Sequence, residues 1–133
     1  MKQLSVKAEN KPGTLAGVAL ALGNSGINIE SITIESFGDH GIVRIVTRDA
    51  ESAKSALRKS GFEAAETSVL VVSIEDKPGQ LGRVATRLAG EGVNIENIYL
   101  LSKRNDRSIF AMRVDDEAKA REVLGRNQVI EKY

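Results

Sequence analysis

One segment of this chain occurs twice. Residues 9–15, Glu-Asn-Lys-Pro-Gly-Thr-Leu, return at 75–81 as Glu-Asp-Lys-Pro-Gly-Gln-Leu, and residues 26–30, Gly-Ile-Asn-Ile-Glu, return at 92–96 as Gly-Val-Asn-Ile-Glu. At an offset of 66 residues, 14 of the 28 positions from 9 to 36 are identical. Beyond Ser36 the offset becomes 67, which predicts one residue inserted in a loop. Such a duplication predicts that the 133 residues fold as two copies of one small structural unit.

The repeat predicts two domains, residues 1–67 and 68–133. Units of roughly 60 residues bury only about 60% of the surface that their unfolded chains expose, so we expect the two units to share an interface. The segment between them agrees with this expectation, because residues 62–74 contain neither Gly nor Pro.

Each copy shows the same order of predicted elements. Alternating apolar residues indicate a first strand, and apolar residues at i, i+3, i+4 and i+7 indicate a helix that ends at Gly26 or Gly92. A second strand from about 27 to 36 and third strands at 42–47 and 109–114 follow. Asp49 and Asp116 are predicted to cap second helices, and short strands at 63–67 and 128–133 close the copies.

The order β-α-β-β-α-β is that of the ferredoxin-like unit, an α+β fold. Its strands lie in the spatial order four-one-three-two, which leaves the second strand at an edge. We therefore expect two ferredoxin-like units side by side, joined through these edges into one eight-stranded antiparallel sheet with the helices on one face.

The apolar phase of the second strand slips at one place in both copies, between Ile29 and Ile32 and between Ile95 and Ile98. Either a β-bulge or a delayed start of the strand produces such a slip.

Composition excludes several functions. The 19 Lys and Arg against 18 Asp and Glu give a net charge of +1, and aromatic residues are 4% of the chain, so a base-stacking RNA-binding surface is not favoured. The absence of Cys excludes thiol catalysis, disulfides and thiolate metal sites, and we expect neither a metal nor a cofactor. The first residues alternate like a strand and no segment resembles a membrane span, which predicts a cytoplasmic protein.

The repeated turns, Asn10-Lys-Pro-Gly and Asp76-Lys-Pro-Gly, lie between the first strand and the first helix. Pro suits the first helical turn, Gly permits close approach of a ligand, and the free N–H groups of a helix start attract a carboxylate. Two readings are open: Asn10 and Asp76 are helix N-caps only, or these turns bind a ligand. Asn28 and Asn94, at the mouth of the second strand, favour the ligand, since edge pairing would bring each amide to the opposite helix start.

These motifs and the element order resemble the ACT domain, over nearly the whole of both copies. Many members of that family bind amino acids where two ACT domains meet. The resemblance implies a ligand-binding set of Asn10, Lys11, Pro12, Gly13, Thr14, Leu15, Asn28 and Ile29 in the first copy, and Asp76, Lys77, Pro78, Gly79, Gln80, Leu81, Asn94 and Ile95 in the second.

The chain departs from that family's pattern in two ways. The serine-binding type has a His two residues before the motif's Asn, where this chain has Ala8 and Ile74. Asp76 replaces Asn10 in the second copy, and a carboxylate accepts hydrogen bonds from an ammonium but donates none to a ligand carboxylate. We therefore expect two unequal sites.

The outer face of the second sheet is predicted to be apolar. Val69, Val71, Tyr99 and Leu101 correspond to polar residues in the first copy. An apolar cluster on a sheet face is typical of an interface, so we expect a homodimer or a partner protein there.

The sequence as a whole predicts a non-catalytic regulatory protein that senses a small amino acid at the interface of its two ACT units. The alternative is a regulatory subunit that binds and controls a separate enzyme of amino-acid metabolism. No nucleic acid or membrane is an expected partner.

Overall fold

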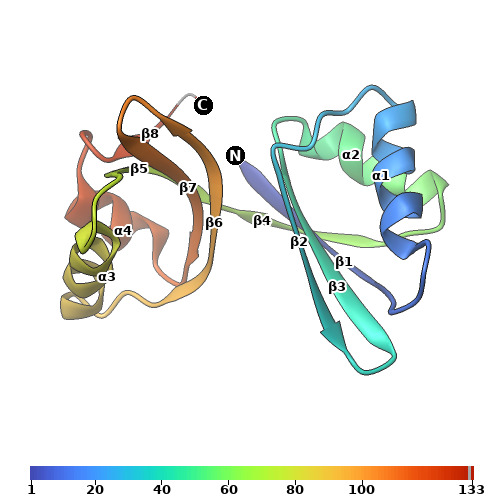
Figure 1. The fold of residues 1–133 in the computed structure, drawn as a ribbon, viewed down its shortest axis with the longest axis horizontal. Coiled ribbons are helices and arrows are strands. Elements are labelled where there is room, and N and C mark those ends of the chain that lie inside the picture. Colours follow the sequence, from blue (N-terminus) through green and yellow to red (C-terminus); the bar gives the residue numbers. More distant parts are fainter. Residues whose placement is uncertain (132) are drawn as a thin grey trace. The chain divides into compact units, whose positions relative to one another are not determined.

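The computed structural model of the chain describes residues 1–131 and 133, which form two compact units, Met1–Ser68 and Val69–Tyr133. In the first unit, the chain forms β1 (Lys2–Glu9), α1 (Thr14–Asn24), β2 (Ser31–Phe37), β3 (His40–Thr47), α2 (Ala50–Lys59) and β4 (Ala64–Ser68) (Figure 1).

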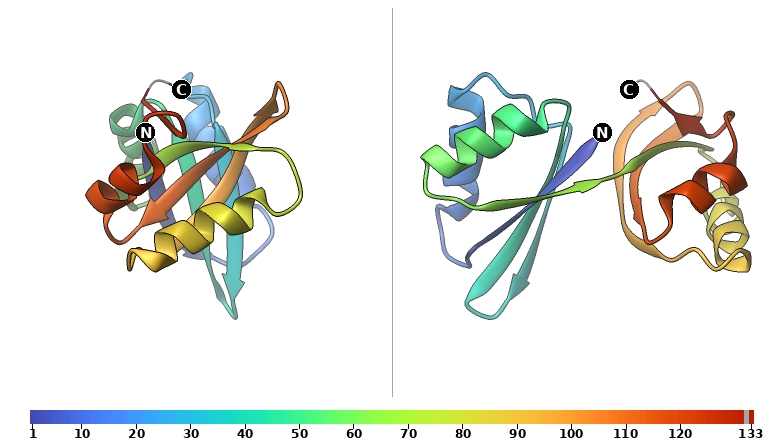
Figure 2. Two further views of the ribbon diagram at one scale, coloured as in Figure 1. Left: turned by 90° about the vertical axis from the view of Figure 1, so that its left-hand side faces the viewer. Right: turned by 180° about the vertical axis from the view of Figure 1, so that it is seen from behind.

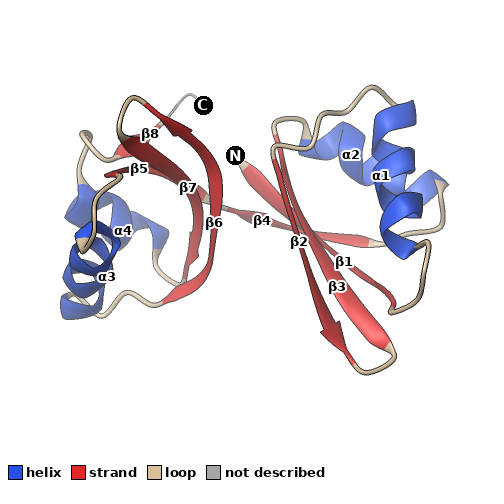
Figure 3. Cartoon of the chain, viewed as in Figure 1, coloured by secondary structure: helices blue, strands red, loops and turns tan. Residues whose placement is uncertain are grey.

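The second unit repeats this order with β5 (Leu70–Glu75), α3 (Gln80–Gly90), β6 (Ile95–Arg104), β7 (Arg107–Val114), α4 (Glu117–Leu124) and β8 (Val129–Ile130) (Figure 3). The predicted α+β fold of two ferredoxin-like units is confirmed. In the described part of the chain, no helix has the length and apolar character that crossing a membrane requires.

The strands form two four-stranded sheets, in the orders β2-β3-β1-β4 and β6-β7-β5-β8. All their pairings are antiparallel, and the second strand of each copy is at an edge, as predicted. Within each unit the two helices cover one face of the sheet (Figures 1 and 2). The joining of both sheets into one eight-stranded sheet stays a prediction.

The core of each unit lies between its sheet and its helices. In the first unit Leu4 and Val6 from β1 meet Leu22 from α1 and Leu57 from α2, and all four side chains are fully buried. Burial of one such side chain contributes roughly 1.5–3 kcal/mol. The period-2 and period-3.6 patterns therefore determine which face each element turns inward.

Gly26 and Gly92 end the first helix of each copy, as predicted. Gly26 has φ 71°, and the amides of Gly26 and Ile27 donate to the carbonyls of Gly23 and Leu22. Gly92 and Val93 make the equivalent bonds to Ala89 and Leu88. This Schellman motif satisfies the last carbonyls of the helix and turns the chain toward the edge strand.

The start of the first helix differs from the prediction. The N-cap residues are Gly13 and Gly79, with φ 91° and 86° and no side-chain capping bond, so Pro12 lies before the helix and not in its first turn. The interpretation of Asn10 and Asp76 as N-caps is therefore wrong, because each stands three residues ahead of the cap. Asp49 and Asp116 do cap α2 and α4, through the amides of Ser52 and Lys119.

The slip in apolar phase has a different cause in each copy. In the first copy the strand is delayed, since β2 begins only at Ser31. In the second copy β6 begins at Ile95 and contains a bulge between Ile95 and Asn97. Each of the two predicted mechanisms thus occurs once.

The extra residue of the second copy lies in a strand and not in a loop. Both hairpins have two-residue turns, because Phe37 pairs with His40 and Arg104 pairs with Arg107. The register of β6 shifts between Leu100 and Ser102, which makes Leu101 the inserted residue. A β-bulge accommodates one residue while the hairpin on either side keeps its pairing.

Two glycines at the end of α1, one inside the helix and one just after it, should change the stability in opposite directions when replaced by alanine. Gly23 is helical with open space around its Cβ position, so Gly23→Ala should stabilise the chain by roughly 0.5–1 kcal/mol. Gly26 has a positive φ, so Gly26→Ala should cost roughly 1–2 kcal/mol. Urea unfolding of both variants measures the difference, and shifts of the same sign would contradict the assigned helix end.

Candidate functional site

The first motif loop is a tight turn from β1 into α1. The amide of Lys11 donates to the carbonyl of Glu9 at 3.1 Å, and the amide of Thr14 donates to the carbonyl of Lys11 at 3.3 Å. The hydroxyl of Thr14 also donates to the carbonyl of Glu9 at 2.7 Å. These bonds fix the direction in which α1 leaves the sheet.

The start of α1 presents amide N–H groups to the loop. The amide of Gly17 donates to the carbonyl of Gly13 at 2.9 Å, as in a regular helix. Helix geometry provides no intrahelical acceptor for the amides of Leu15 and Ala16 before it. These two amides, at the positive end of the helix dipole, can bind a carboxylate.

Two hollows flank this loop. The larger, about 620 Å³, is lined from β1, the loop, β3 and the α2–β4 turn, by Lys7, Ala8, Glu9, Lys11, Pro12, Gly13, Thr14, His40, Gly61 and Phe62. The smaller, about 120 Å³, lies toward β2 and β3 and is lined by Ala8, Glu9, Asn10, Lys11, Thr14, Leu15, Ile34, Gly41 and Val43. The larger has the size of a small-molecule site.

Charges of both signs line the larger hollow. The Nζ of Lys11 lies 2.9 Å from Oε2 of Glu9, and this hydrogen bond and charge lower the pKa of the Glu9 carboxyl. Lys7 and His40 supply further donors. A ligand that carries both a carboxylate and an ammonium finds partners for each.

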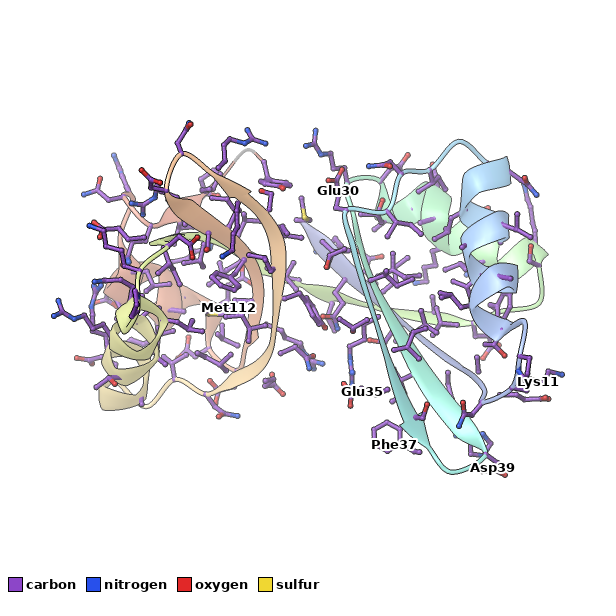
Figure 4. The ribbon with its side chains drawn as sticks, viewed as in Figure 1. Lys11, Glu30, Glu35, Phe37, Asp39 and Met112 are labelled. Carbon is purple, nitrogen blue, oxygen red and sulfur yellow. The ribbon has the colours of Figure 1, made fainter. Side chains whose placement is uncertain are left out.

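The side chain of Asn10 bonds the β2–β3 hairpin. Its Nδ2 donates to the carbonyl of Gly38 at 2.8 Å, and its Oδ1 accepts from the hydroxyl of Ser36 at 3.4 Å. Its amide donates to the carbonyl of Asp39 at 2.9 Å. Asn10 therefore holds the loop against the hairpin tip, which Figure 4 marks with Phe37 and Asp39.

In the second unit Asp76 connects the motif loop to the β6–β7 hairpin in the same way, but through an ion pair. Both its carboxylate oxygens accept from Nζ of Lys103 at 3.0 Å, and its amide donates to the carbonyl of Asp106 at 2.9 Å. The hydrogen bond from Lys103, with a second from Ser108, holds the pKa of the Asp76 carboxyl below its ordinary value. The second motif carboxylate is thus already paired with a cation.

The other side of the second loop also carries bonded side chains. Arg107, on β7, donates from Nε to the hydroxyl of Ser73 and from Nη2 to the Ser73 carbonyl at 2.9 Å. The amide of Ser73 donates to the carbonyl of Gln128 at 2.7 Å. The sequence analysis assigned no role to Ser36, Lys103 and Arg107, because their contacts depend on how the hairpin strands pair.

Asn28 lies at the opposite end of its unit from the loop. Its carbonyl accepts from the Thr47 hydroxyl at 3.2 Å, and its Nδ2 donates to Glu30 at 3.4 Å. Thr47 pairs with Lys2 at the start of β1, whereas Asn10 follows the end of β1, eight residues or about 26 Å away at the rise of a strand. Figure 4 shows Glu30 and Lys11 at opposite ends of the first unit. One unit alone therefore cannot bring its Asn28 to its own loop.

In the second unit Asn94 occupies the equivalent place. Its amide donates to Oδ1 of Asp115 at 2.8 Å, and its carbonyl accepts from the amide of Asp115 at 3.1 Å. The acidic residues that end the two repeated segments form ion pairs. Oε1 of Glu30 lies 3.2 Å from Nε of Arg48, and Oε1 of Glu96 lies 3.6 Å from Nε of Arg113. Across residues 1–131 and 133, no group of three or more His, Asp or Glu is placed to hold a metal ion.

The predicted apolar face of the second sheet has a defined place in the structure. Val69, Val71 and Tyr99 are 3%, 4% and 9% exposed in the single chain, and Leu101 is half-buried at the bulge. Leu70 and Val72 point into the helix-covered core, so Val69 and Val71 point to the other face. Their role in a homodimer stays a prediction.

Comparison with known proteins identifies the family. A sequence profile described as an ACT domain pair matches residues 1–131. The chain belongs to this family. ACT domains are regulatory, so the site described above is a candidate ligand site of a regulatory protein.

Solved structures agree with this assignment. The chain is similar to a protein of Bacteroides thetaiotaomicron, with 33% identity over 97% of this chain and 90% of that one and a TM-score of 0.88. The regulatory subunits of aspartate kinase from Thermus thermophilus and Thermus flavus share its fold, at 23% and 22% identity and TM-scores of 0.68 and 0.64. Each alignment covers 92% of this chain, and 87% and 86% of those chains. A search of curated proteins found no match.

The charge tie of the second loop predicts a pH effect. In Lys103→Met, the pKa of Asp76 should rise toward its ordinary value, which an NMR titration of the carboxyl carbon measures. A lowered pKa in the folded state stabilises the fold above the ordinary value of about 4, and this contribution is lost as the pH falls through the folded pKa. The thermal stability advantage of the wild type should therefore shrink below about pH 4.

Lys77→Met is the matched control for this titration. Lys77 lies in the same loop but pairs with Glu75, at 3.7 Å, so its loss should leave the Asp76 pKa unchanged. An equal rise of the Asp76 pKa in both variants would contradict the specific tie to Lys103.

Proposed function

We propose that this ACT domain pair is a non-catalytic regulatory protein that binds a small amino acid at its Pro-Gly motif loop. The ligand carboxylate binds the amides of Leu15 and Ala16 at the start of α1. Its ammonium binds acceptors such as Glu9 at the rim of the larger hollow. Ligand binding favours one arrangement of the protein over another, and so changes what its surfaces can bind.

The observation that carries this proposal is the combination of the helix start and the larger hollow, which Pro12, Gly13 and Thr14 line, while Leu15 lines the smaller hollow. A volume of about 620 Å³ accommodates an amino acid, and Lys11 and Glu9 give the hollow both signs of charge. A ligand with one sign of charge would leave part of this lining unmatched. The family assignment supports a regulatory ligand.

The site requires a second ACT unit to be complete. Asn28 lies at the far end of β1 from the loop of its own unit, so the amide that completes a site comes from another ACT unit. We propose that the unit interface brings these two motifs together. A ligand that bridges two units stabilises their association, which is the coupling that a sensor needs.

A screen of amino acids by thermal shift and calorimetry tests this function. The melting temperature should rise as the ligand concentration rises. At a concentration 100 times the dissociation constant, the free energy of unfolding should increase by about 2.7 kcal/mol. Gly13→Ala should weaken binding, because its residue must hold φ 91° to aim the helix amides. Gly125→Ala places the same change at a positive φ at the end of α4, in the second unit and outside the lining of both hollows, and should bind normally. A lack of heat with every amino acid would overturn the proposal.

A second candidate function is a regulatory subunit that binds a separate enzyme of amino-acid metabolism. The observation that favours it is the edge strand β2, where Ile34 and Phe37 are 47% and 55% exposed. Exposed apolar side chains along an unpaired strand edge are typical of a protein interface.

The edge provides the test. If a catalytic chain binds β2, the variant Phe37→Asp, which lies outside the lining of both hollows, should lose a stoichiometric complex with that enzyme and keep its amino-acid binding. Light scattering of the purified chain determines whether a homodimer forms instead, since the same variant would then become monomeric. A wild type that is monomeric and co-purifies with no enzyme would exclude both outcomes.

A further inference from the structure

We propose that only the first motif loop binds the ligand, because the second loop is closed by its own side chains. The Lys103 ammonium already binds both carboxylate oxygens of Asp76, whereas Asn10 at the equivalent position makes only neutral hydrogen bonds, and Arg107 is bonded to Ser73 on the strand that leads into the second loop. This inference rests on the proposed amino-acid function and specifies which of the two repeated sites performs it.

The register shows which residues of the two hairpins are equivalent. Ser36 pairs with Gly41, and Lys103 pairs with Ser108. In each hairpin this is the second residue pair counted from the two-residue turn. Lys103 therefore stands where Ser36 stands, although the repeat in the sequence aligns Ser36 with Ser102. The bulge at Leu101 causes this difference of one position.

The two copies thus differ by a matched pair of substitutions. In the first copy a neutral amide, Asn10, accepts from a short hydroxyl, Ser36, at 3.4 Å. In the second copy a carboxylate, Asp76, accepts from a long amine, Lys103, at 3.0 Å through both oxygens. The change to an acid and the change to a base occur at two positions that touch.

An external ammonium must compete with Lys103 at the second loop. A group tethered to the same hairpin acts at an effective concentration in the millimolar range, without loss of the translational freedom that a free ligand loses. The carboxylate of Asp76 also repels a ligand carboxylate that approaches the start of α3, and Asn10 does not. Both effects disfavour the zwitterion that the first loop accepts.

A second, independent contact covers the other side of this loop. Arg107 donates to the carbonyl of Ser73 at 2.9 Å, and the carbonyl of Gln128 accepts from the amide of Ser73 at 2.7 Å. Residues of the equivalent first-unit region, Lys7, His40 and Phe62, line the larger hollow. The same position in the fold lines a hollow in the first copy and carries the hydrogen bonds of Arg107 and Ser73 in the second.

A reciprocal exchange of residues tests the inference by calorimetry on the full chain, with the amino acid that the screen identifies. The wild type should bind one ligand per chain. Asp76→Asn/Lys103→Ser/Arg107→His, which installs the residues of the first copy, should bind two. Asn10→Asp/Ser36→Lys, which installs those of the second, should weaken the wild-type site by about tenfold or more. Arg104→Ser removes a charge from the same hairpin and should leave one site.

The outcomes separate this inference from the proposed function. Two sites of similar affinity in the wild type, or one site in the triple variant with an unchanged fold, would overturn the closure of the second loop and leave the amino-acid function standing. Absence of binding in every chain, including the triple variant, would overturn the function itself. Thermal melts of each variant, compared with the wild type, establish that the fold is retained.

Discussion

The turn from the first strand into the first helix depends on one backbone conformation, the positive φ of Gly13 and of Gly79. A residue with a Cβ loses roughly 1–2 kcal/mol in that conformation, which explains why both copies have Gly at this position. The turn determines where α1 and α3 begin and places their first amides at the end of the sheet. The hairpin tip, the two hollows of the first unit and the charged tie of the second all form around it.

The tie between loop and hairpin has the same backbone in both units and different chemistry. The amides of Asn10 and Asp76 donate to the hairpin turn at 2.9 Å in each case, so the scaffold does not depend on the side chain. This independence lets the side chains diverge. Exposed ion pairs contribute little to stability, so the pairing of Asp76 with Lys103 affects mainly what else can occupy the loop.

Local patterns predicted the elements of this fold well. The periodicity of Leu4, Val6 and Leu22 identified the core faces, and Gly26 and Asp49 marked helix ends through chemistry that acts within a few residues. Pro12 was placed wrongly because a Pro-Gly pair fits both the first helical turn and the turn before it. The φ of the following Gly decides between them, and no pattern in the sequence states that angle.

Non-local registers explain what sequence reasoning missed at the site. The change of offset after Ser36 placed the inserted residue between Ser36 and the third strand, whereas the pairing of β6 with β7 shows that it is Leu101, before the residue that the sequence aligns with Ser36. With the insertion in a loop, Ser36 corresponds to Ser102, and Lys103 becomes an exposed hairpin residue. With the insertion at the bulge, Lys103 faces Asp76. A shift of one residue thus separates a solvated loop from a specific contact.

The asymmetry of the two copies limits how a chain of this kind can respond to a ligand. Cooperative binding needs at least two coupled sites, so a chain with one open loop follows a simple saturation curve by itself. A second chain would add a second site, and its coupling to the first would depend on the interface between chains. With the second loop closed, as proposed, duplication leaves recognition of the ligand to the first unit alone.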